Sequence, residues 1–343
     1  MITVGPEKLA RFARDVLLKA GTTDGQASAT VRAMTHASLH GIDSHGFRLL
    51  GYYAEGLVRG FVKKEPNVSI ARPRKAAVLV DADGGLGHFP SFLAMEEACA
   101  IASQLGIGMA AVKNSTHFGA ASAYTICASE AGYIGFLACN SGALVALHGG
   151  TAAFHGTNPI SFSAPLRGKD PFLLDIATSA MSWNKMLEHR EEFGDLPEGV
   201  LLGQHGDFSD VAEDSVLAPL GGENFGYKGA GLAGMAEVLS AMLTGMNLSF
   251  EEDGKEAGPS KLGHFMLAID PKTFIGREAF EERLTSYLGA IASTATENSR
   301  VYAAGGPEWE ARADRMERGI PVTATAQKEM AAAGERFGIP FPS

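Results

Sequence analysis

The sequence predicts an α/β fold, and three observations support this. Apolar residues recur at helical spacing through the first 60 residues. From about residue 76 onward, strand-like runs alternate with helical stretches. The chain has 343 residues, of which 45% are hydrophobic and only 20% are charged. That is enough apolar material for one large core or for two to three smaller ones.

The first two elements are expected to be helices. The first has a single apolar face, and Gly21 follows it as a C-cap. That face contains Leu9, Phe12 and Val16. The segment Thr23-Asp-Gly-Gln26 has the form of a capping box and opens a second helix to about Leu39.

A third helix is expected to begin at Ser44, which suits an N-cap. Its apolar stripe contains Leu50, Tyr53 and Leu57. The polar, proline-containing stretch 63–75 is expected to be a connector without regular structure.

Strands and helices then alternate along the rest of the chain. Strands are expected over 76–80, 109–112, 133–138, 160–164, 172–176 and 264–269. Helices are expected over 91–104, 120–130, 231–243 and from about 279 onward.

Composition excludes several functional classes. A net charge of -10 without a basic cluster argues against nucleic acid as a partner. No apolar run approaches 18 residues, and the first residues carry charges where a signal peptide would be apolar. Three cysteines without CxxC spacing fit a reduced chain with no disulfide framework. We therefore expect a cytoplasmic enzyme that does not bind membranes.

Glycine is abundant, at 42 of 343 residues, and two glycine-rich segments resemble dinucleotide-binding loops but fail in context. Gly106-Ile-Gly-Met-Ala-Ala111 leaves a helix and enters a strand, the reverse of the Rossmann order, so it is expected to be a helix C-cap. Gly229-Ala-Gly-Leu-Ala-Gly234 opens a helix, but no strand precedes it. Lys228 lies in what is expected to be a glycine-rich loop before that helix, where it could contact a phosphate.

The histidines do not predict a metal site. His36 and His40 share a helix face at i, i+4, and His45 is close in sequence. The glutamate of an HExxH motif is absent, and no carboxylate cluster lies beside them. No catalytic metal is expected.

The segment Asp43-Ser-His-Gly-Phe-Arg48-Leu-Leu-Gly-Tyr52 carries the strongest chemical signal. At about 100° per residue, His45, Arg48 and Tyr52 would fall within roughly 60° of one another on a helix. Such a face suits a small carboxylate, because arginine clamps the acid and histidine or tyrosine exchanges a proton. The alternative is a solvated helix face with an ordinary surface arginine.

Polar residues also follow or interrupt the expected strands. His117, in Asn114-Ser-Thr-His-Phe-Gly119, lies between a strand and a helix, where active-site loops concentrate. It is either a general acid/base or a structural loop histidine. Asp175 lies inside the apolar run 172–177, where a carboxylate is costly unless it is paired. It is expected to orient a histidine or a ligand, or else to cap a turn.

Further motifs complete an ordered set. They are Ser44-His-Gly, Asn114 to Gly119, Gly156-Thr-Asn-Pro159, Asp175-Ile-Ala-Thr-Ser179, Pro219-Leu-Gly-Gly222, Lys228-Gly-Ala-Gly-Leu232 and Gly305-Gly-Pro-Glu308. Together they resemble the malate/L-lactate dehydrogenase family of the sulfolactate dehydrogenase type, which is unrelated to the Rossmann lactate dehydrogenases. The resemblance covers nearly the whole chain.

The resemblance implies a fold and an assembly. It implies a non-Rossmann α/β sheet domain over 63–279. It also implies a helical domain built from both chain ends, 1–62 and 280–343. Members form homodimers with the active site near the subunit interface. The family includes ureidoglycolate dehydrogenases, 2,3-diketogulonate reductases and reductases of piperideine- and pyrroline-2-carboxylate.

The resemblance also implies roles for particular residues. His45 and His117 are the acid/base candidates, Arg48 is the carboxylate clamp, and Ser44, Tyr52 and Asp175 assist catalysis. Substrate contacts are expected from Arg48, Tyr52, Thr157 and Asn158. Cofactor contacts are expected from Ser141, Asp175, Ile176, Ala177, Thr178, Ser179, Lys228, Gly306, Pro307 and Glu308.

The chain departs from the family pattern at three places. Trp183 and Asn184 precede Lys185, where a small residue and a glycine are usual. The late P-G-E motif reads Gly306-Pro-Glu308, and the segment 204–210 keeps only part of its expected pattern. These places lie near expected cofactor contacts, so the choice between NAD and NADP cannot be transferred from the family.

The expected function is hydride transfer between NAD(P)H, with NAD favoured, and a small 2-keto or 2-hydroxy acid resembling malate or lactate. One alternative is the reduction of a cyclic imino acid, which also presents a carboxylate and takes one proton. A metal-dependent hydrolase or aldolase that uses the histidines, and a ligand-binding protein without catalysis, are the more distant alternatives.

Overall fold

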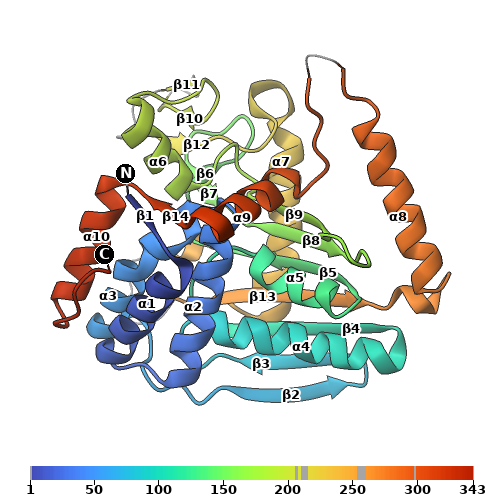
Figure 1. The fold of residues 1–343 in the computed structure, drawn as a ribbon, viewed down its shortest axis with the longest axis horizontal. Coiled ribbons are helices and arrows are strands. Elements are labelled where there is room, and N and C mark those ends of the chain that lie inside the picture. The colour runs from blue at the N-terminus through green and yellow to red at the C-terminus, as the bar shows by residue number, and fades with distance from the viewer. Residues whose placement is uncertain (1, 205–207, 210–214, 253–259, 297–298, 343) are drawn as a thin grey trace.

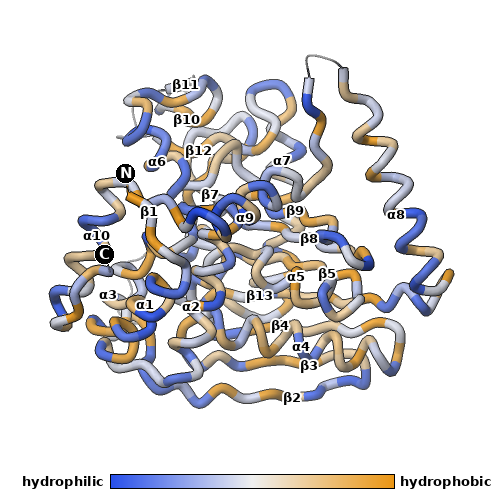
Figure 2. The backbone as a smooth tube through the Cα atoms, in the orientation of Figure 1, coloured by the Kyte–Doolittle hydropathy of each residue, from blue (hydrophilic) through white to orange (hydrophobic). Residues whose placement is uncertain are grey.

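The structure is a computed structural model that describes residues 2–204, 208–209, 215–252, 260–296 and 299–342. Figure 1 shows a sheet flanked by helices, with the two chain ends together on one side of the molecule. Figure 2 shows apolar residues along β3, β4 and β13 of the sheet and polar residues along the exposed helix α9 (Gly306–Arg318). Among the residues that the structure describes, no helix is long and apolar enough to cross a membrane.

The central sheet has seven strands in the order β2-β3-β4-β13-β5-β8-β9. Only β3 and β4 are parallel, and every other neighbouring pair is antiparallel. The strands are β2 (Ser69–Arg74), β3 (Ala77–Asp81), β4 (Ile107–Ser115), β13 (Leu262–Ile269), β5 (Ile134–Cys139), β8 (Ile160–Ala164) and β9 (Phe172–Ile176).

Helices cover both faces of this sheet. Side chains alternate along β13, so His264 contacts Ser91 of α4 (His88–Leu105) while Gly263 packs on Ser240 behind the sheet. Ser240 belongs to the π turn that continues α7 (Gly222–Glu237). Helix α5 (Ser122–Glu130) packs beside α4 on β5 and β8. The face under α4 and α5 forms one continuous apolar core.

The chain ends form a second layer with its own core. Strand β1 (Ile2–Val4) pairs with β14 (Ile320–Val322), and the adjoining helices share buried apolar side chains. Those helices are α1 (Pro6–Ala20), α2 (Asp24–Leu39), α3 (Leu50–Arg59) and α10 (Ala324–Glu335). As predicted, Gly21 ends α1 in the left-handed conformation and the Thr23 side chain caps α2. Gln26 does not complete the capping box, because its side chain accepts a hydrogen bond from the backbone of Leu86 instead.

A smaller unit, with its own sheet, lies above β8 and β9 in the view of Figure 1. Its strand order is β11-β10-β12-β6-β7, and helix α6 (Trp183–Phe193) packs on it through Met186. The strands are β6 (Val145–Ala146), β7 (Ala153–His155), β10 (Leu201–Leu202), β11 (Phe208–Ser209) and β12 (Val216–Leu217). Helix α8 (Arg277–Ala292) stands apart from the sheet at the edge of the molecule (Figure 1).

Two of the elements predicted beyond residue 60 are wrong. Residues 69–74 of the expected connector form β2, an edge strand that tolerates Pro73 because one side of it has no neighbouring strand. The helix expected from residue 231 begins at Gly222, so Lys228 lies within α7 and not in a loop. Gly229 serves packing there, because a Cβ would overlap the carbonyl oxygen of Leu220.

Candidate active site

Two histidine rings lie nearly parallel between α3 and the end of β4. The ring centroids of His45 and His117 are 5.7 Å apart and their planes differ by 18°. Nδ1 of His45 lies 3.0 Å from the Ser44 hydroxyl, and Nδ1 of His117 lies 2.9 Å from the Tyr53 hydroxyl. Because Nδ1 of each ring is engaged, Nε2 is the atom left for proton exchange.

His45 lies in a tight turn and not in the predicted third helix, which is wrong. Residues Asp43–His45 and Phe47–Leu49 form two 3₁₀ turns, and α3 begins only at Leu50. Gly46 separates the turns with extended backbone, at φ -91° and ψ -148°. A Cβ at Gly46 would overlap the Ser38 hydroxyl, which accepts a 3.1 Å hydrogen bond from the backbone of Phe47. His45, Arg48 and Tyr52 therefore do not share one helix face.

A cavity of about 370 Å³ opens beside His45. Its walls come from segments far apart in sequence, near residues 41–45, 119–121, 157–159 and 175–185, together with Leu220 and α9. Eight of the predicted site residues line it: Ser44, His45, Thr157, Asp175, Ile176, Ala177, Ser179 and Glu308. We call this space the His45 cavity.

Burial keeps both histidines neutral. It lowers the pKa of His45 to about 4. Burial, helped by the neighbouring His45 and His264, lowers the pKa of His117 to about 3. Each imidazole is thus unprotonated near pH 7 and can accept a proton. Only His45 lines the cavity; His117 stacks behind it.

Asp175 lies near the end of β9, where the strand reaches the cavity. Its carboxylate accepts a 2.7 Å hydrogen bond from the backbone N–H of Ser122, at the start of α5. Burial, helped by Glu308, raises the pKa of Asp175 to about 6 against the opposing effect of that hydrogen bond. Asp175 therefore combines a backbone partner with a position on the cavity wall, as a ligand-contacting carboxylate requires.

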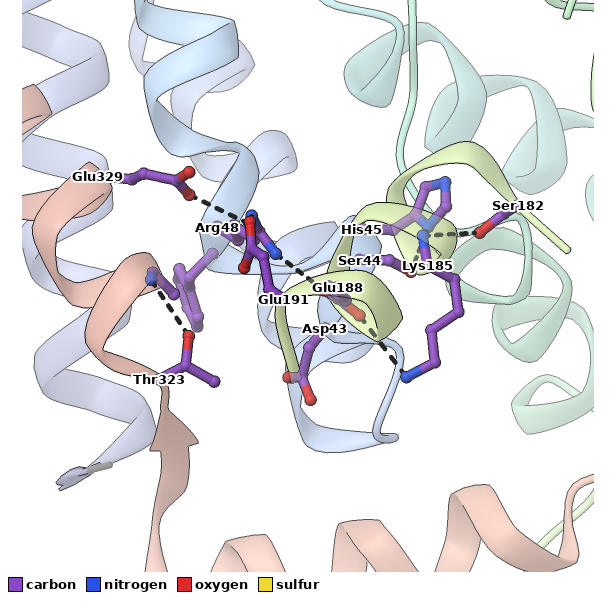
Figure 3. A network of polar contacts seen from close by, with 12 residues as sticks. Asp43, Ser44, His45, Arg48, Ser182, Lys185, Glu188, Glu191, Thr323 and Glu329 are labelled. Carbon is purple, nitrogen blue, oxygen red and sulfur yellow. Dashed lines mark hydrogen bonds and ion pairs between the residues drawn. The ribbon is translucent and has the colours of Figure 1, made fainter. Parts of the chain in front are cut away.

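The structure does not bring Arg48 to the His45 cavity. Its guanidinium contacts Glu191 at 2.6 Å and Glu329 at 3.1 Å, and it lies 3.9 Å from Glu188 (Figure 3). Arg48 lines a neighbouring cavity of about 440 Å³, which we call the Arg48 cavity. Lys185 is the one charged residue that lines both cavities.

Asn158 is also placed away from the substrate space that was predicted for it. It is fully buried, at φ 28°, and its amide is used by the surrounding backbone and side chains. Its oxygen accepts from Ser141 N–H at 3.0 Å, and its nitrogen donates to Glu237 at 3.0 Å. Asn158 thus holds the loop that carries Thr157 to the cavity, and the Ser141 hydroxyl accepts from Thr157 N–H at 3.1 Å.

The remaining predicted residues do not line the His45 cavity themselves. Thr178 is fully buried behind its wall, and its hydroxyl donates to the carbonyl of Thr157. Gly306 and Pro307 form the first turn of α9, which carries Glu308 to the wall. Tyr52 is 60% exposed, with its ring 5.9 Å from that of His117. Lys228 lies on the outside of α7 over the Phe225 ring and does not line either cavity.

Sequence reasoning missed a layer of buried polar residues behind His117. Tyr53, assigned only to packing, is 1% exposed and its ring packs on His88 at 4.7 Å. His88 and His264 are fully buried, with Nδ1 bound to Thr30 and Ser91 and with Nε2 unpaired. A buried tyrosine in an apolar stripe needs a partner for its hydroxyl group. That signal could have paired Tyr53 with a nearby histidine.

Among the residues that the structure describes, no three histidine, cysteine, aspartate or glutamate side chains converge on a metal-sized site. The altered segment 204–210 lies mostly outside the described residues, because 205–207 and 210 are not among them.

A family model for malate/L-lactate dehydrogenase matches residues 4–331 of this chain. The chain belongs to the malate/L-lactate dehydrogenase family. The family predicted from the sequence is therefore confirmed, and with it an oxidoreductase of hydroxy acids. The α/β architecture is confirmed as well, because the chain superposes on malate dehydrogenase from Entamoeba histolytica with a TM-score of 0.95. That match has 27% identity and covers 100% of this chain and 99% of the other.

Curated relatives of this family member carry several dehydrogenase names. It is 33% identical to malate dehydrogenase from Pyrococcus horikoshii, over 98% of this chain and 96% of that protein. It is 30% identical to ureidoglycolate dehydrogenase (NAD(+)) from Escherichia coli K12, over 83% of this chain and 82% of that protein. It is 32% identical to (2R)-3-sulfolactate dehydrogenase (NADP(+)) from Chromohalobacter salexigens, over 74% of this chain and 77% of that protein.

A solved reductase structure is also similar. Δ1-piperideine-2-carboxylate reductase from Pseudomonas syringae has a TM-score of 0.86 at 27% identity, over 97% of this chain and 100% of that one.

Proposed function

We propose that this chain is an NAD- or NADP-dependent dehydrogenase that interconverts a small 2-hydroxy acid and its 2-keto acid. The observation that carries the proposal is the neutral, partly buried His45 on the wall of a cavity that Asp175 and Glu308 also line. A base beside a cavity of substrate size is what removal of a hydroxyl proton needs. Family membership supplies the reaction class.

The cavity fits part of a nicotinamide dinucleotide. Ribose hydroxyls and the nicotinamide amide are hydrogen-bond donors, and Asp175 and Glu308 offer carboxylate acceptors on the wall. Between them Ile176 and Ala177 give an apolar surface against which a flat ring can pack. These four residues, with Ser179, would hold the cofactor. When bound, the nicotinamide accepts or supplies the hydride.

His45 carries the proton in this scheme. In oxidation its free Nε2 accepts the proton of the substrate hydroxyl, and in reduction the same atom returns a proton to the carbonyl oxygen. Ser44 holds Nδ1 at 3.0 Å and so fixes the direction in which Nε2 points. His117 stacks on the far side of His45, and its own ring is fixed by Tyr53. We assign Ser44, His117 and Tyr53 to positioning His45.

A cyclic imino acid is the second candidate substrate. The similarity to the piperideine-2-carboxylate reductase structure favours it, and an imine nitrogen takes up one proton as a carbonyl oxygen does. The same His45 would serve both reactions.

We also propose that the chain divides into a non-Rossmann sheet domain, 63–279, and a helical domain made of 1–62 and 280–343. The mostly antiparallel sheet supports the first part, because a Rossmann sheet is parallel. The β1–β14 pairing and the core that α1, α3 and α10 share support the second part.

We further propose a homodimer. Of the sixteen residues of α8, only Glu281 is buried in the single chain. A row of apolar side chains runs along the helix, and each of them is only partly buried or, at Tyr287, exposed. The row is Phe280, Leu284, Tyr287, Leu288 and Ile291. A second copy packed along α8 would bury this row.

One assay tests the proposed function. Purified protein is mixed with NADH or NADPH and a panel of 2-keto acids and cyclic imines, and nicotinamide absorbance is followed. We expect turnover of at least one 2-keto acid resembling pyruvate or oxaloacetate. Absence of turnover with every substrate and both cofactors would contradict the proposal.

A further inference from the structure

We propose that Lys185, and not Arg48, binds the substrate carboxylate in this chain. This inference rests on the proposed function, since it names the cation that a 2-keto or 2-hydroxy acid meets in the His45 cavity. Among the residues that line this cavity, Lys185 is the sole lysine or arginine, and two carboxylates, Asp175 and Glu308, face the same space. An anionic substrate placed beside them needs that cation.

Arg48 is occupied elsewhere. Its side chain is 16% exposed and donates charge-assisted hydrogen bonds to Glu191 and Glu329, with Glu188 close by. Withdrawing it would break both of these hydrogen bonds, which hold the guanidinium at two points. An added substrate anion would also meet these carboxylates at short range. The surroundings of Arg48 therefore repel the group that it was expected to clamp.

Lys185 has the opposite properties. Its side chain is 54% exposed, and its one ion pair within the described residues is a 3.6 Å contact with Glu188 at i, i+3. This contact is longer than the two hydrogen bonds that hold Arg48, and the lysine side chain is more than half exposed, so a substrate carboxylate can compete for the ammonium group. Four rotatable bonds let the ammonium group move between the two cavities that Lys185 lines.

The backbone of Lys185 is held at the edge of the His45 cavity. The Ser182 hydroxyl caps α6 by accepting a 3.4 Å hydrogen bond from Lys185 N–H, and Ser182 itself lines the cavity. Figure 3 shows Lys185 leaving the start of α6 near His45, with its side chain toward Glu188, while Arg48 points to Glu191 and Glu329. The backbone of Lys185 is thus fixed while its ammonium group can move, which suits a side chain that binds a substrate carboxylate.

The test compares matched variants by steady-state kinetics with the best substrate of the wild-type protein. Lys185→Met should raise the KM for the acid by about 10- to 100-fold, as expected for loss of one charge-assisted hydrogen bond. NADH affinity, measured separately by quenching of nicotinamide fluorescence, should stay within twofold. Lys185→Arg should restore most of the affinity for the acid. Glu188→Gln removes the competing carboxylate and should lower KM by up to about fivefold.

Two further variants complete the comparison. Arg190→Met removes an exposed cation from the same helix, away from both cavities, and should leave KM unchanged. Arg48→Met should change KM less than Lys185→Met does. The proposal is overturned if Arg48→Met raises KM as much as or more than Lys185→Met. It is also overturned if Lys185→Met weakens NADH binding while KM for the acid is unchanged. A wild-type protein without any turnover would instead contradict the proposed function, so the two failures are distinguishable.

Discussion

The hydroxyl group of Tyr53 lies 2.9 Å from Nδ1 of His117, and Tyr53 is only 1% exposed. Water has little access to this contact, so no solvent molecule can replace the tyrosine if it is removed. The pair links the apolar stripe of α3 to the loop after β4, two parts of the chain that are 64 residues apart. Through it, the packing of the helical layer fixes the ring that stacks on His45.

Tyr53→Phe should therefore lower both stability and turnover. Leaving Nδ1 of buried His117 without a partner should cost about 1–3 kcal/mol in the free energy of unfolding. Urea titration measures this cost, and kcat should fall while KM changes little. Tyr52→Phe is the matched control, because the Tyr52 side chain is 60% exposed. Equal losses of unfolding free energy in both variants would contradict the role given to Tyr53.

His45→Ala should reduce kcat by about 10²–10⁴-fold, since a general base contributes that much. His117→Ala should reduce it less, because His117 does not line the cavity and acts through His45. Single-turnover kinetics with saturating substrate separates chemistry from binding in both variants. A larger loss in His117→Ala would assign the proton to His117 instead.

The rate of hydroxy-acid oxidation should depend on pH through the titration of Asp175. Its pKa is raised to about 6, so the carboxylate is protonated below that pH and loses acceptor strength toward donor groups of the cofactor. We expect kcat/KM to rise with pH through about 6, and Asp175→Asn to abolish this rise. A second fall below about pH 4, where His45 becomes protonated, should remain in the variant. If the rise near pH 6 persists in Asp175→Asn, another group causes it.

Acid should destabilise the fold through its buried histidines. The pKa values of His45, His117 and His264 are lowered from 6.5 to about 4, 3 and 3, so the unfolded chain binds more protons than the folded chain below pH 6.5. Stability is then lost as pH falls from 6.5 toward 3, at up to about 1.4 kcal/mol per pH unit for each histidine. The raised pKa of Asp175 has the opposite effect, because its protonation stabilises the folded chain as pH falls from about 6 to 3.8. This single group offsets only part of the loss that the histidines cause.

His264→Asn tests this linkage, because asparagine can keep the hydrogen bond to Ser91 without the titrating ring. Urea titrations between pH 4.5 and 6.5 give the slope of the unfolding free energy against pH. In His264→Asn this slope should decrease by up to about 1.4 kcal/mol per pH unit, the contribution of one bound proton. An unaltered slope in His264→Asn would show that His264 does not stay neutral in the folded protein.

The assembly can be tested on α8. Tyr287 is 57% exposed in the single chain and lies in the middle of the apolar row. Light scattering of the wild-type protein should give twice the mass of the chain, and Tyr287→Asp should shift the protein toward the monomer. Ser286→Asp, on the adjacent exposed position, is the control and should remain dimeric. A monomeric wild-type protein would contradict the proposed dimer.

The sequence predicts those parts of the fold that depend on neighbours in the chain. The strands Ile160–Ala164 and Phe172–Ile176 have the predicted bounds, and Gly21 ends the first helix as expected. Each of these features follows from a local pattern of apolar residues or from one residue's backbone preference. The motif 175–179 likewise reaches the cavity because it follows a strand that ends there.

The errors come from contacts between distant residues. The predicted third helix breaks because Gly46 packs on Ser38, a constraint that helical periodicity in 44–57 does not contain. Arg48 is withdrawn by Glu191 and Glu329, which are 143 and 281 residues away in sequence. Because these carboxylates lie far from Arg48 in sequence, its partners could be found only in three dimensions.

The pairing of β1 with β14 has a consequence for the chain during its synthesis. Val4 packs in one core with Ile320 and Val322, so the core that α1 to α3 share is completed only after the ribosome has added β14 and α10. At roughly 5–20 residues per second, that wait lasts about 15 to 60 s. Glu308 joins the cavity wall equally late. Part of this core and part of the cavity wall therefore stay incomplete while the ribosome makes the whole of the central sheet.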